Sequence, residues 1–159
     1  FSRDASTDPF VEESVHVIVD ETLSLCGERM KQHKIQFELE AFSSGITILC
    51  RRVQISQVLL NLLNNSIDAV SPISDKRIQL SVKELGGNIE ISISDSGPTI
   101  PLEVREKLFQ PFFTTKPVGG GTGLGLSVSK GLIEAHNGTL SLDADPKKTC
   151  FIIRLPKQT

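Results

Sequence analysis

The amino-acid sequence predicts an α/β (α+β) two-layer sandwich, in which a mixed, mostly antiparallel sheet is covered on one face by helices. The chain has 159 residues, of which 38% are hydrophobic, and this suits one domain with a real core. Segments of helical and of strand period follow in the order helix, hairpin, helix, hairpin, long loop, helix, hairpin. Strands joined by tight turns cannot be parallel neighbours, which predicts the mostly antiparallel sheet.

The first third of the chain predicts one helix followed by a β-hairpin. Apolar residues recur at helical spacing over residues 11–33, which favours a helix. Residues 34–41, "KIQFELEA", alternate apolar and polar side chains, as a half-buried strand does. The turn "SSG" at 43–45 and the apolar "ITILC" at 46–50 indicate a returning strand, so we expect a hairpin.

Residues 53–70 predict the main helix of the domain. This segment, "VQISQVLLNLLNNSIDAV", carries a wide apolar stripe at helical spacing, and Pro72 ends it. The alternating strands "RIQLSVKEL" at 77–85 and "NIEISISD" at 88–95 are joined by two glycines, which predicts a second hairpin.

The last part of the chain predicts a long loop, a helix and a third hairpin. Residues 96–122 are rich in proline and glycine, with one or two helical turns expected at 102–109. A helix is expected after Gly123 and ends at Asn137 and Gly138, before the strands "TLSLDA" and "TCFIIRLP". A long loop inside a compact domain is uncommon and usually functional, often as a lid.

The composition excludes several classes of protein. The net charge is −2 and no basic stretch is present, so binding to nucleic acid is not expected. Cys26, Cys50 and Cys150 lie far apart, which argues against a zinc site and suits a reducing compartment. No apolar run is long enough to span a bilayer, and no signal peptide is visible. We therefore expect a cytoplasmic domain without membrane contact, while the parent protein could be attached to a membrane.

The run "GGGTGLGLS", residues 119–127, needs a physical reason. Glycine loses more conformational entropy on folding than any other residue, and five of the twelve glycines lie here, directly before a helix. The run matches neither the P-loop pattern GxxxxGK[ST] nor the dinucleotide pattern GxGxxG. A helix N-terminus still offers unpaired N–H groups and a positive dipole end to a phosphate. From this run alone, a flexible linker remains the alternative.

The predicted main helix has an unusual polar face. Asn61 and Asn65 are spaced i,i+4 and Asp68 follows Asn65 by three, so their side chains share one face. Asn and Asp are poor residues for helix interiors, and amide oxygens suit Mg²⁺ held against phosphates; a solvated polar edge is the alternative. Asp95 ends an apolar strand two residues before Gly97, where it could accept a hydrogen bond from an exocyclic amine or only initiate a turn.

Four stretches, in this order, resemble the ATP-binding catalytic domain of sensor histidine kinases. "QVLLNLLNNSIDAV" resembles the N box of that family, "DSGPTIP" its G1 box, "LFQPFFTTK" its F box and "GGGTGLGLS" its G2 box. The resemblance covers nearly the whole chain from about residue 11, and "FFTTK" and "NSIDAV" are most similar to the nitrogen-regulatory type. It implies the Bergerat ATP-binding fold, shared with gyrase, the Hsp90 chaperones and the MutL repair proteins.

The resemblance implies a site for ATP and Mg²⁺. Asn65 would coordinate Mg²⁺ and bridge it to the ATP phosphates, and Asn61 would support it one turn earlier. Asp95 would accept a hydrogen bond from the adenine amino group, and Gly97 would let the nucleotide lie close. Residues 96–122 would form the ATP lid. Phe109, Phe112 and Phe113 would anchor the lid. From its charge and its position in the lid, and not from the resemblance, Lys116 could reach the γ-phosphate, and a solvated lysine is the alternative. The other expected contacts to the cofactor are Asp68, Gly121, Thr122, Gly123, Leu124, Gly125 and Thr149.

Two departures from the family pattern bear on activity. Thr99 stands where the family usually has a second glycine, and a β-branched residue disfavours positive φ, which would reduce lid motion or nucleotide affinity. Asn61 stands where the ATPase members of the superfamily carry a Glu as general base. Because an amide cannot take a proton from water, we expect transfer to another nucleophile rather than efficient hydrolysis.

The phosphoacceptor histidine is expected outside this chain. His16, His33 and His136 do not match the family's His-Glu/Asp motif, and His136 is expected to serve a helix end. Residues 1–10 are expected to be a remnant of an upstream linker or dimerisation helix, and residues 11–159 the ATP-binding domain. The expected partners are ATP, the histidine-containing dimerisation domain of the parent protein and a response regulator, with the isolated domain monomeric.

Two alternatives remain from the sequence. A degenerate kinase domain could act as a protein-interaction module, for which Thr99 is the supporting feature. A hydrolase of the chaperone or repair type is disfavoured, because the catalytic Glu is missing and the chain is short.

Overall fold

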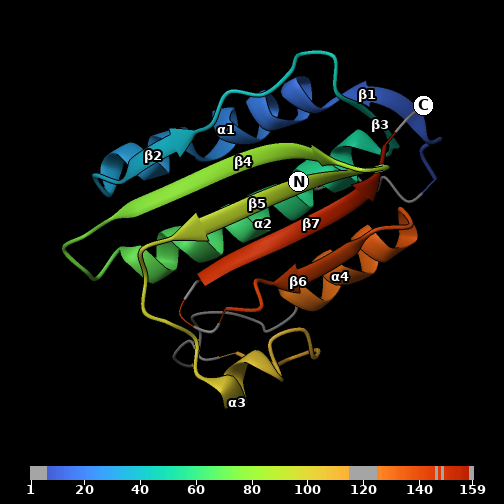
Figure 1. Cartoon of the computed structure of the whole chain (residues 1–159). Coiled ribbons are helices and arrows are strands. Elements are labelled where there is room, and N and C mark those ends of the chain that lie inside the picture. The colour runs from blue at the N-terminus through green and yellow to red at the C-terminus, as the bar shows by residue number, and fades with distance from the viewer. Residues whose placement is uncertain (1–6, 115–124, 146, 148, 158–159) are drawn as a thin grey trace.

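The computed structural model describes residues 7–114, 125–145, 147 and 149–157, and it has the predicted two-layer architecture (Figure 1). Five strands form one sheet in the order β2-β4-β5-β7-β6. The helices α1 (Val15–Gln32), α2 (Arg52–Val70) and α4 (Gly125–Ala135) lie behind this sheet, on one face of it. The short helix α3 (Leu102–Arg105) lies beyond the end of the sheet.

Two details of the first third differ from the sequence-based expectation. The predicted first helix does not begin at residue 11, because Val11–Ser14 form strand β1 and α1 begins at Val15. The predicted hairpin of β2 (Gln36–Leu39) and β3 (Thr47–Cys50) is wrong: β3 pairs antiparallel with β1 in a separate two-stranded sheet, and β2 pairs parallel with β4. An alternating pattern identifies a strand and its buried face, but it carries no information about which strand is its partner.

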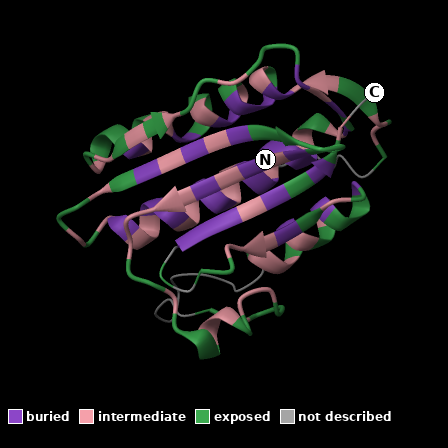
Figure 2. Cartoon of the chain, viewed as in Figure 1, coloured by how far each residue is buried: buried purple, intermediate pink, exposed green. Residues whose placement is uncertain are grey.

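The helix α2 is the centre of the core, as its apolar stripe predicts. Its buried face packs against the sheet, and Figure 2 shows the matching alternation of buried and less buried residues along β4 and β5. Because apolar area removed from water stabilises a fold by about 25 cal/mol per Å², this face fixes the helix on the sheet. The fully buried apolar residues of α2 are Ile55, Val58, Leu59, Leu62, Leu63, Ile67 and Val70.

The two other predicted hairpins are confirmed. The strands β4 (Arg77–Leu85) and β5 (Asn88–Asp95) pair antiparallel around a turn in which Gly86 has a φ of 62°. The strands β6 (Thr139–Leu142) and β7 (Thr149–Pro156) also pair antiparallel, and β7 lies beside β5. This register places Asp95 directly opposite Thr149.

His136 connects three segments, and it serves a helix end as predicted. It follows α4 and is 3% exposed. Its Nε2 accepts a hydrogen bond from the backbone N–H of Arg51 at 3.1 Å, so its Nδ1 carries the proton and donates to the Leu132 carbonyl at 2.7 Å. The Phe10 ring stacks on the imidazole at a centroid distance of 4.8 Å. One neutral imidazole therefore joins α4, the residue before α2 and the N-terminal segment.

This arrangement predicts a pH-dependent stability. Burial, with the positive charge of Arg51, lowers the pKa of His136, while the hydrogen bond to Leu132 opposes the shift. Because the unfolded chain then binds this proton more readily, the free energy of unfolding falls as the pH drops below about 6.5. In urea titrations at pH 7.5, 6.5 and 5.5, we expect His136→Gln to lose less of its free energy of unfolding on acidification than the unmodified chain. Equal losses in both proteins contradict this assignment.

Candidate functional site

A cavity of about 690 Å³ lies between the polar side of α2 and the end of the sheet where β5 and β7 meet. This volume lies within the usual range of small-molecule sites, roughly 300–1,000 Å³. One wall is polar and comes from α2, and another comes from Asp95 and the segment at 98–101. Thr149 and Phe151 of β7 and the start of α4 complete it. The α2 residues in this wall are Asn61, Asn64, Asn65, Asp68 and Ala69.

The structure brings together the two groups on which the sequence analysis depends. The amide-bearing face of α2 and the Asp95 carboxylate line the same cavity, although they are about 30 residues apart in the chain. Asn61, Asn65 and Asp68 share one face of α2, as their spacing predicts. A ligand in this space therefore meets amides on one side and a carboxylate on another.

Asn61 and Asn65 differ in their bonding. The Asn61 amide donates to the Ser129 hydroxyl of α4 at 3.2 Å, so it links the two helices. The Asn65 side chain makes no hydrogen bond to any residue that the structure describes. Its amide is therefore available to a ligand or a metal ion in the cavity, within the described part of the chain.

Asp68 is held by an arginine that the sequence analysis did not identify. Arg29 of α1 donates through Nη2 to Asp68 Oδ1 at 2.6 Å and through Nη1 to Asn64 Oδ1 at 3.0 Å. The two acceptors are one helical turn apart on α2, so one guanidinium bridges both. Arg29 lies outside the four boxes, and nothing in the sequence around it indicates that it contacts the site.

Asp95 has a perturbed carboxyl group at the end of β5. Burial raises the pKa of Asp95, and the backbone N–H of Gly97, which donates to its Oδ1 at 2.8 Å, opposes this shift. The buried Ser66 hydroxyl lies close enough to lower the pKa further, although it makes no hydrogen bond of ordinary geometry to any described residue. A ligand that donates a hydrogen bond to this carboxylate would stabilise its charged form.

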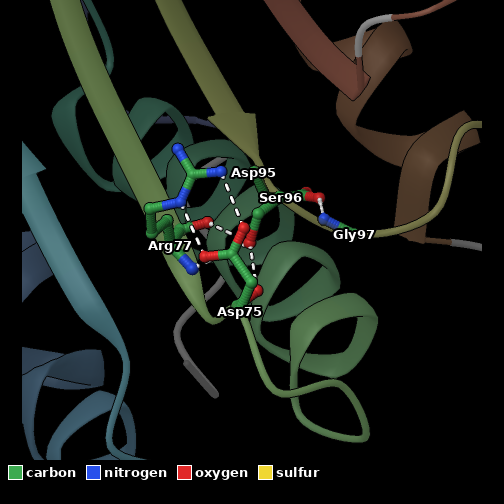
Figure 3. A network of polar contacts seen from close by, with 5 residues as sticks. All are labelled: Asp75, Arg77, Asp95, Ser96 and Gly97. Atoms are coloured by element: carbon green, nitrogen blue, oxygen red, sulfur yellow. Dashed lines mark hydrogen bonds and ion pairs between the residues drawn. The ribbon is translucent and has the colours of Figure 1, made fainter.

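A polar network fixes the position of Asp95 (Figure 3). The Ser96 hydroxyl accepts from the backbone N–H of Arg77 at 2.8 Å and donates to the Asp75 carbonyl at 2.5 Å. The Arg77 guanidinium donates to both oxygens of the Asp75 carboxylate, at 2.7 and 2.8 Å. These bonds join the start of β4 to the residue that follows β5, so they hold the backbone directly after Asp95.

Gly97 is required by close packing. An added Cβ would lie 2.8 Å from Asp95 Oδ1, which accepts from the Gly97 N–H, and 3.0 Å from the Ala69 Cβ, which is attached directly to the backbone of α2. Next to it, the Thr149 hydroxyl donates to the Pro98 carbonyl at 3.2 Å, and Thr149 lines the cavity beside Asp95. Thr149 therefore lines the cavity, whereas Gly97 packs against α2 and is not among the residues that line it, and the roles expected for both residues stay predictions.

Thr99 lies at the cavity without backbone strain. It is exposed and lines the same space. Among the non-glycine residues that the structure describes, only Lys34, Phe112 and Asn137 have a positive φ. The backbone φ of Thr99 is therefore not positive, and a β-branched residue can adopt this conformation.

The three phenylalanines of the "LFQPFFTTK" stretch have different environments. Phe109 packs edge-on against Phe151 of β7 at a centroid distance of 6.3 Å, and Lys130 of α4 lies 5.1 Å from its ring. Phe113 lines the cavity. The expectation that Phe112 anchors the lid is not met, because its side chain is 74% exposed and its backbone has a φ of 65°, which turns it away from the core.

Part of the predicted site lies outside the described residues. Gly125 is described, begins α4 and lines the cavity. The expected contacts at Lys116, Gly121, Thr122, Gly123 and Leu124 fall in the segment 115–124, which the structure does not describe.

The donor groups present agree with an oxygen-bound cation that is shared with a ligand. No group of three or more His, Cys, Asp or Glu residues among those described could hold a metal ion by itself. The Asn65 amide supplies a hard oxygen ligand, and Mg²⁺ typically takes few protein ligands and completes its shell with water and substrate phosphates. None of the described helices has both the length and the apolar character needed to cross a bilayer.

The domain is an α/β sandwich with a ligand-sized cavity between α2 and the end of β5, and comparison with known proteins identifies its family. The family described as "Histidine kinase-, DNA gyrase B-, and HSP90-like ATPase" matches residues 50–159. The chain belongs to this family, as a catalytic domain of the histidine kinase type.

Individual relatives agree with this assignment. The chain is 35% identical over 140 residues to the C4-dicarboxylate transport sensor protein DctB of Rhizobium meliloti strain 1021; the match covers 88% of this chain and 22% of that protein. The solved catalytic domain of histidine kinase ThkA is 33% identical, with a TM-score of 0.82 over 93% of this chain and 95% of that one. The structure of ThkA in complex with the response regulator protein TrrA matches at 31% identity and a TM-score of 0.79, over 94% of this chain and 42% of that one. The chain thus spans about a fifth of DctB and nearly all of the ThkA catalytic domain.

The contacts of Gly97 predict a large effect of one added methyl group. In Gly97→Ala, the new Cβ must displace Asp95 or α2, so we expect the free energy of unfolding to fall by about 1–3 kcal/mol, measured by urea titration. Gly27→Ala in α1 is the control, because its Cβ meets nothing within 4 Å and the change should stabilise the helix by about 0.5–1 kcal/mol. A Gly97→Ala protein as stable as this control contradicts the packing constraint.

Proposed function

We propose that this chain positions Mg-ATP for transfer of the γ-phosphoryl group to a histidine in a separate dimerisation domain of its parent protein. One observation carries the proposal: the Asp95 carboxylate and the amides of α2 line a single cavity large enough for a nucleotide. The histidine kinase relatives support it at the level of the family.

In this proposal the two ends of the cavity have different tasks. At the sheet, Asp95 accepts a hydrogen bond from the adenine amino group, while Gly97 and Thr149 hold the segment beside it. At α2, Asn65 ligates Mg²⁺, and Asn61 and Asp68 shape the surrounding surface. Bound Mg²⁺ would neutralise charge on the phosphates. Residues 96–122 act as the lid, which includes the contacts expected from Lys116, Gly121 and Thr122, and the contacts expected from Gly123, Leu124 and Gly125 follow directly after it.

The residues of the site favour transfer over hydrolysis. Asn61 has an amide where a hydrolase needs a base, and that amide already donates to Ser129. The three histidines of the chain are hydrogen-bonded or buried within the domain. His16 bonds to the Phe42 carbonyl at 2.9 Å and His33 to the Ser71 hydroxyl at 3.3 Å, while His136 is buried. These contacts support the proposal that the acceptor imidazole belongs to another domain.

The remaining assignments are part of the same proposal. We assign residues 11–159 to the catalytic domain and residues 1–10 to the linker. The parent protein is proposed to phosphorylate a response regulator in the cytoplasm, and the complex of the relative ThkA with TrrA supports such a partner. The similarity of "FFTTK" and "NSIDAV" supports our proposal that the chain is of the nitrogen-regulatory type. The isolated domain is proposed to be monomeric.

Asp95 is expected to determine the choice of purine. A carboxylate accepts from the amino group of adenine and repels the carbonyl oxygen of guanine, whereas an amide can donate to that oxygen. We expect Asp95→Asn to weaken ATP binding by about 10- to 100-fold, because hydrogen bonds to charged groups contribute about 1.5–3 kcal/mol, and to bind GTP at least as well as before. Competition titrations with ATP and GTP measure both constants. An unchanged ratio of the two affinities removes Asp95 from the base-binding role.

Asn65 is expected to determine the Mg²⁺ dependence of binding. We expect Asn65→Ala to weaken binding of a nonhydrolysable ATP analogue by about tenfold or more when Mg²⁺ is present, and much less when EDTA replaces it. Calorimetric titration measures both constants, and the parent protein carrying the same change should form correspondingly less acid-labile phosphate from ATP.

The controls separate this proposal from its alternatives. Asn88→Ala, on the exposed hairpin far from the cavity lining, should bind the analogue normally. An unmodified chain that gives no heat and no thermal shift with Mg-ATP analogue supports an interaction module instead. Steady ATP turnover by the isolated chain supports a hydrolase.

A further inference from the structure

Arg29 is the one basic residue among those described that bonds to the α2 wall of the cavity. It lies in the last turn of α1 and does not line the cavity itself. Its guanidinium reaches α2 from outside, and it bonds to Asn64 and Asp68, which do line the cavity. Any influence of Arg29 on a bound ligand therefore passes through these two side chains.

The bond to Asn64 fixes the orientation of an amide. A guanidinium carries only donors, so the Asn64 oxygen must face Arg29, and the Oδ1 to Nη1 distance of 3.0 Å agrees. The NH₂ group of Asn64 is then the part of the amide left for a partner in the cavity. A pair of N–H donors suits a phosphate oxygen and not a metal ion. Asn64 and Asn65 are adjacent in the chain, but they suit ligands of opposite charge. Asn64 offers N–H donors to an anion, whereas the Asn65 oxygen can bind a cation.

The bond to Asp68 compensates a negative charge at the same place. Asp68 and Arg29 form a short ion pair of 2.6 Å, with side chains 35% and 39% exposed. Such a half-exposed pair contributes little to folding stability. Its effect on a highly charged ligand is larger, because a carboxylate on the wall of a cavity repels phosphates unless a cation offsets it.

We propose that Arg29 is a positioning residue for the phosphate end of the cavity: it offsets the charge of Asp68 and turns the Asn64 amide so that its N–H groups meet a phosphate oxygen. This inference rests on the proposed function, since it names how the same site receives the triphosphate. It assigns to α1, which carries none of the four boxes, a part in nucleotide recognition.

The test compares ligands that share the base and differ in the number of phosphates. At fixed Mg²⁺ concentration, dissociation constants are measured for a nonhydrolysable ATP analogue, for ADP and for adenosine. In Arg29→Met we expect about tenfold weaker binding of the ATP analogue, a smaller loss for ADP, and adenosine within about twofold of the unmodified chain. The loss should shrink as salt is added, because salt screens partly exposed charges.

A rescue variant separates this role from a structural one. Adding Asp68→Asn to Arg29→Met removes the carboxylate, so the affinity for the ATP analogue should return to within about threefold of the unmodified value. A purely structural role predicts no rescue and equal losses for all three ligands. Arg29→Lys keeps the charge but cannot bridge both acceptors, and it should fall between the unmodified chain and Arg29→Met; it also serves as the test if Arg29→Met does not fold.

Arg52→Met is the matched control. Arg52 pairs with Glu21 of α1 at 3.5 Å and with Glu13 at 3.6 Å. It is therefore a second arginine that connects α1 and α2, and it is not among the residues that line the cavity. Its affinities should be unchanged within twofold. If Arg29→Met behaves like Arg52→Met, or weakens adenosine as much as the ATP analogue, the inference is overturned while the proposed function stands. If the unmodified chain binds none of the three ligands, the proposed function fails and the inference fails with it.

Discussion

The close approach of α2 to the end of β5 is the constraint on which the rest of the site depends. Gly97 lies so near Ala69 that a single methyl group would collide, and its N–H bonds to the Asp95 carboxylate at 2.8 Å. This packing holds the carboxylate partly out of water and raises its pKa. It also sets the distance between Asp95 and the amides of α2, and therefore the size of the cavity. If α2 lay farther from the end of β5, Asp95 and the amides of α2 could not contact one ligand at the same time.

The two ends of the cavity are supported by different kinds of interaction. At Asp95 the support comes from side-chain hydroxyls bonded to the backbone: the Ser96 hydroxyl bonds to backbone groups of Arg77 and Asp75, and the Thr149 hydroxyl donates to the Pro98 carbonyl. At α2 the support is made of side chains from the neighbouring helices, with Arg29 on one side and Ser129 on the other. The Asp95 end of the cavity is therefore bonded to the backbone beside the sheet, and the α2 wall is bonded to side chains of the two neighbouring helices.

The sequence was sufficient for features that depend on local spacing. The apolar stripe of α2, its polar face and the turn after β5 were all predicted, because period and turn chemistry act within a few residues. The pairing of β2 and β3 was predicted wrongly, since their alternating patterns are equally satisfied by other partners. Arg29 was missed for a related reason: its bonds cross 35 and 39 residues, and its helix shows no motif. The parts that could not be predicted are the contacts between distant segments.

The position of α4 connects the cavity to the N-terminal segment. Its first residue, Gly125, lines the cavity, and His136, just after its last turn, is stacked on Phe10 and bonded to the residue before α2. Near its middle, Ser129 accepts the hydrogen bond from Asn61. α4 therefore has contacts to the cavity at its first residue and to the N-terminal segment just beyond its last turn. Its buried residues are Ser129 and Ile133, fewer than those of α2, so less buried surface holds α4 on the core than holds α2.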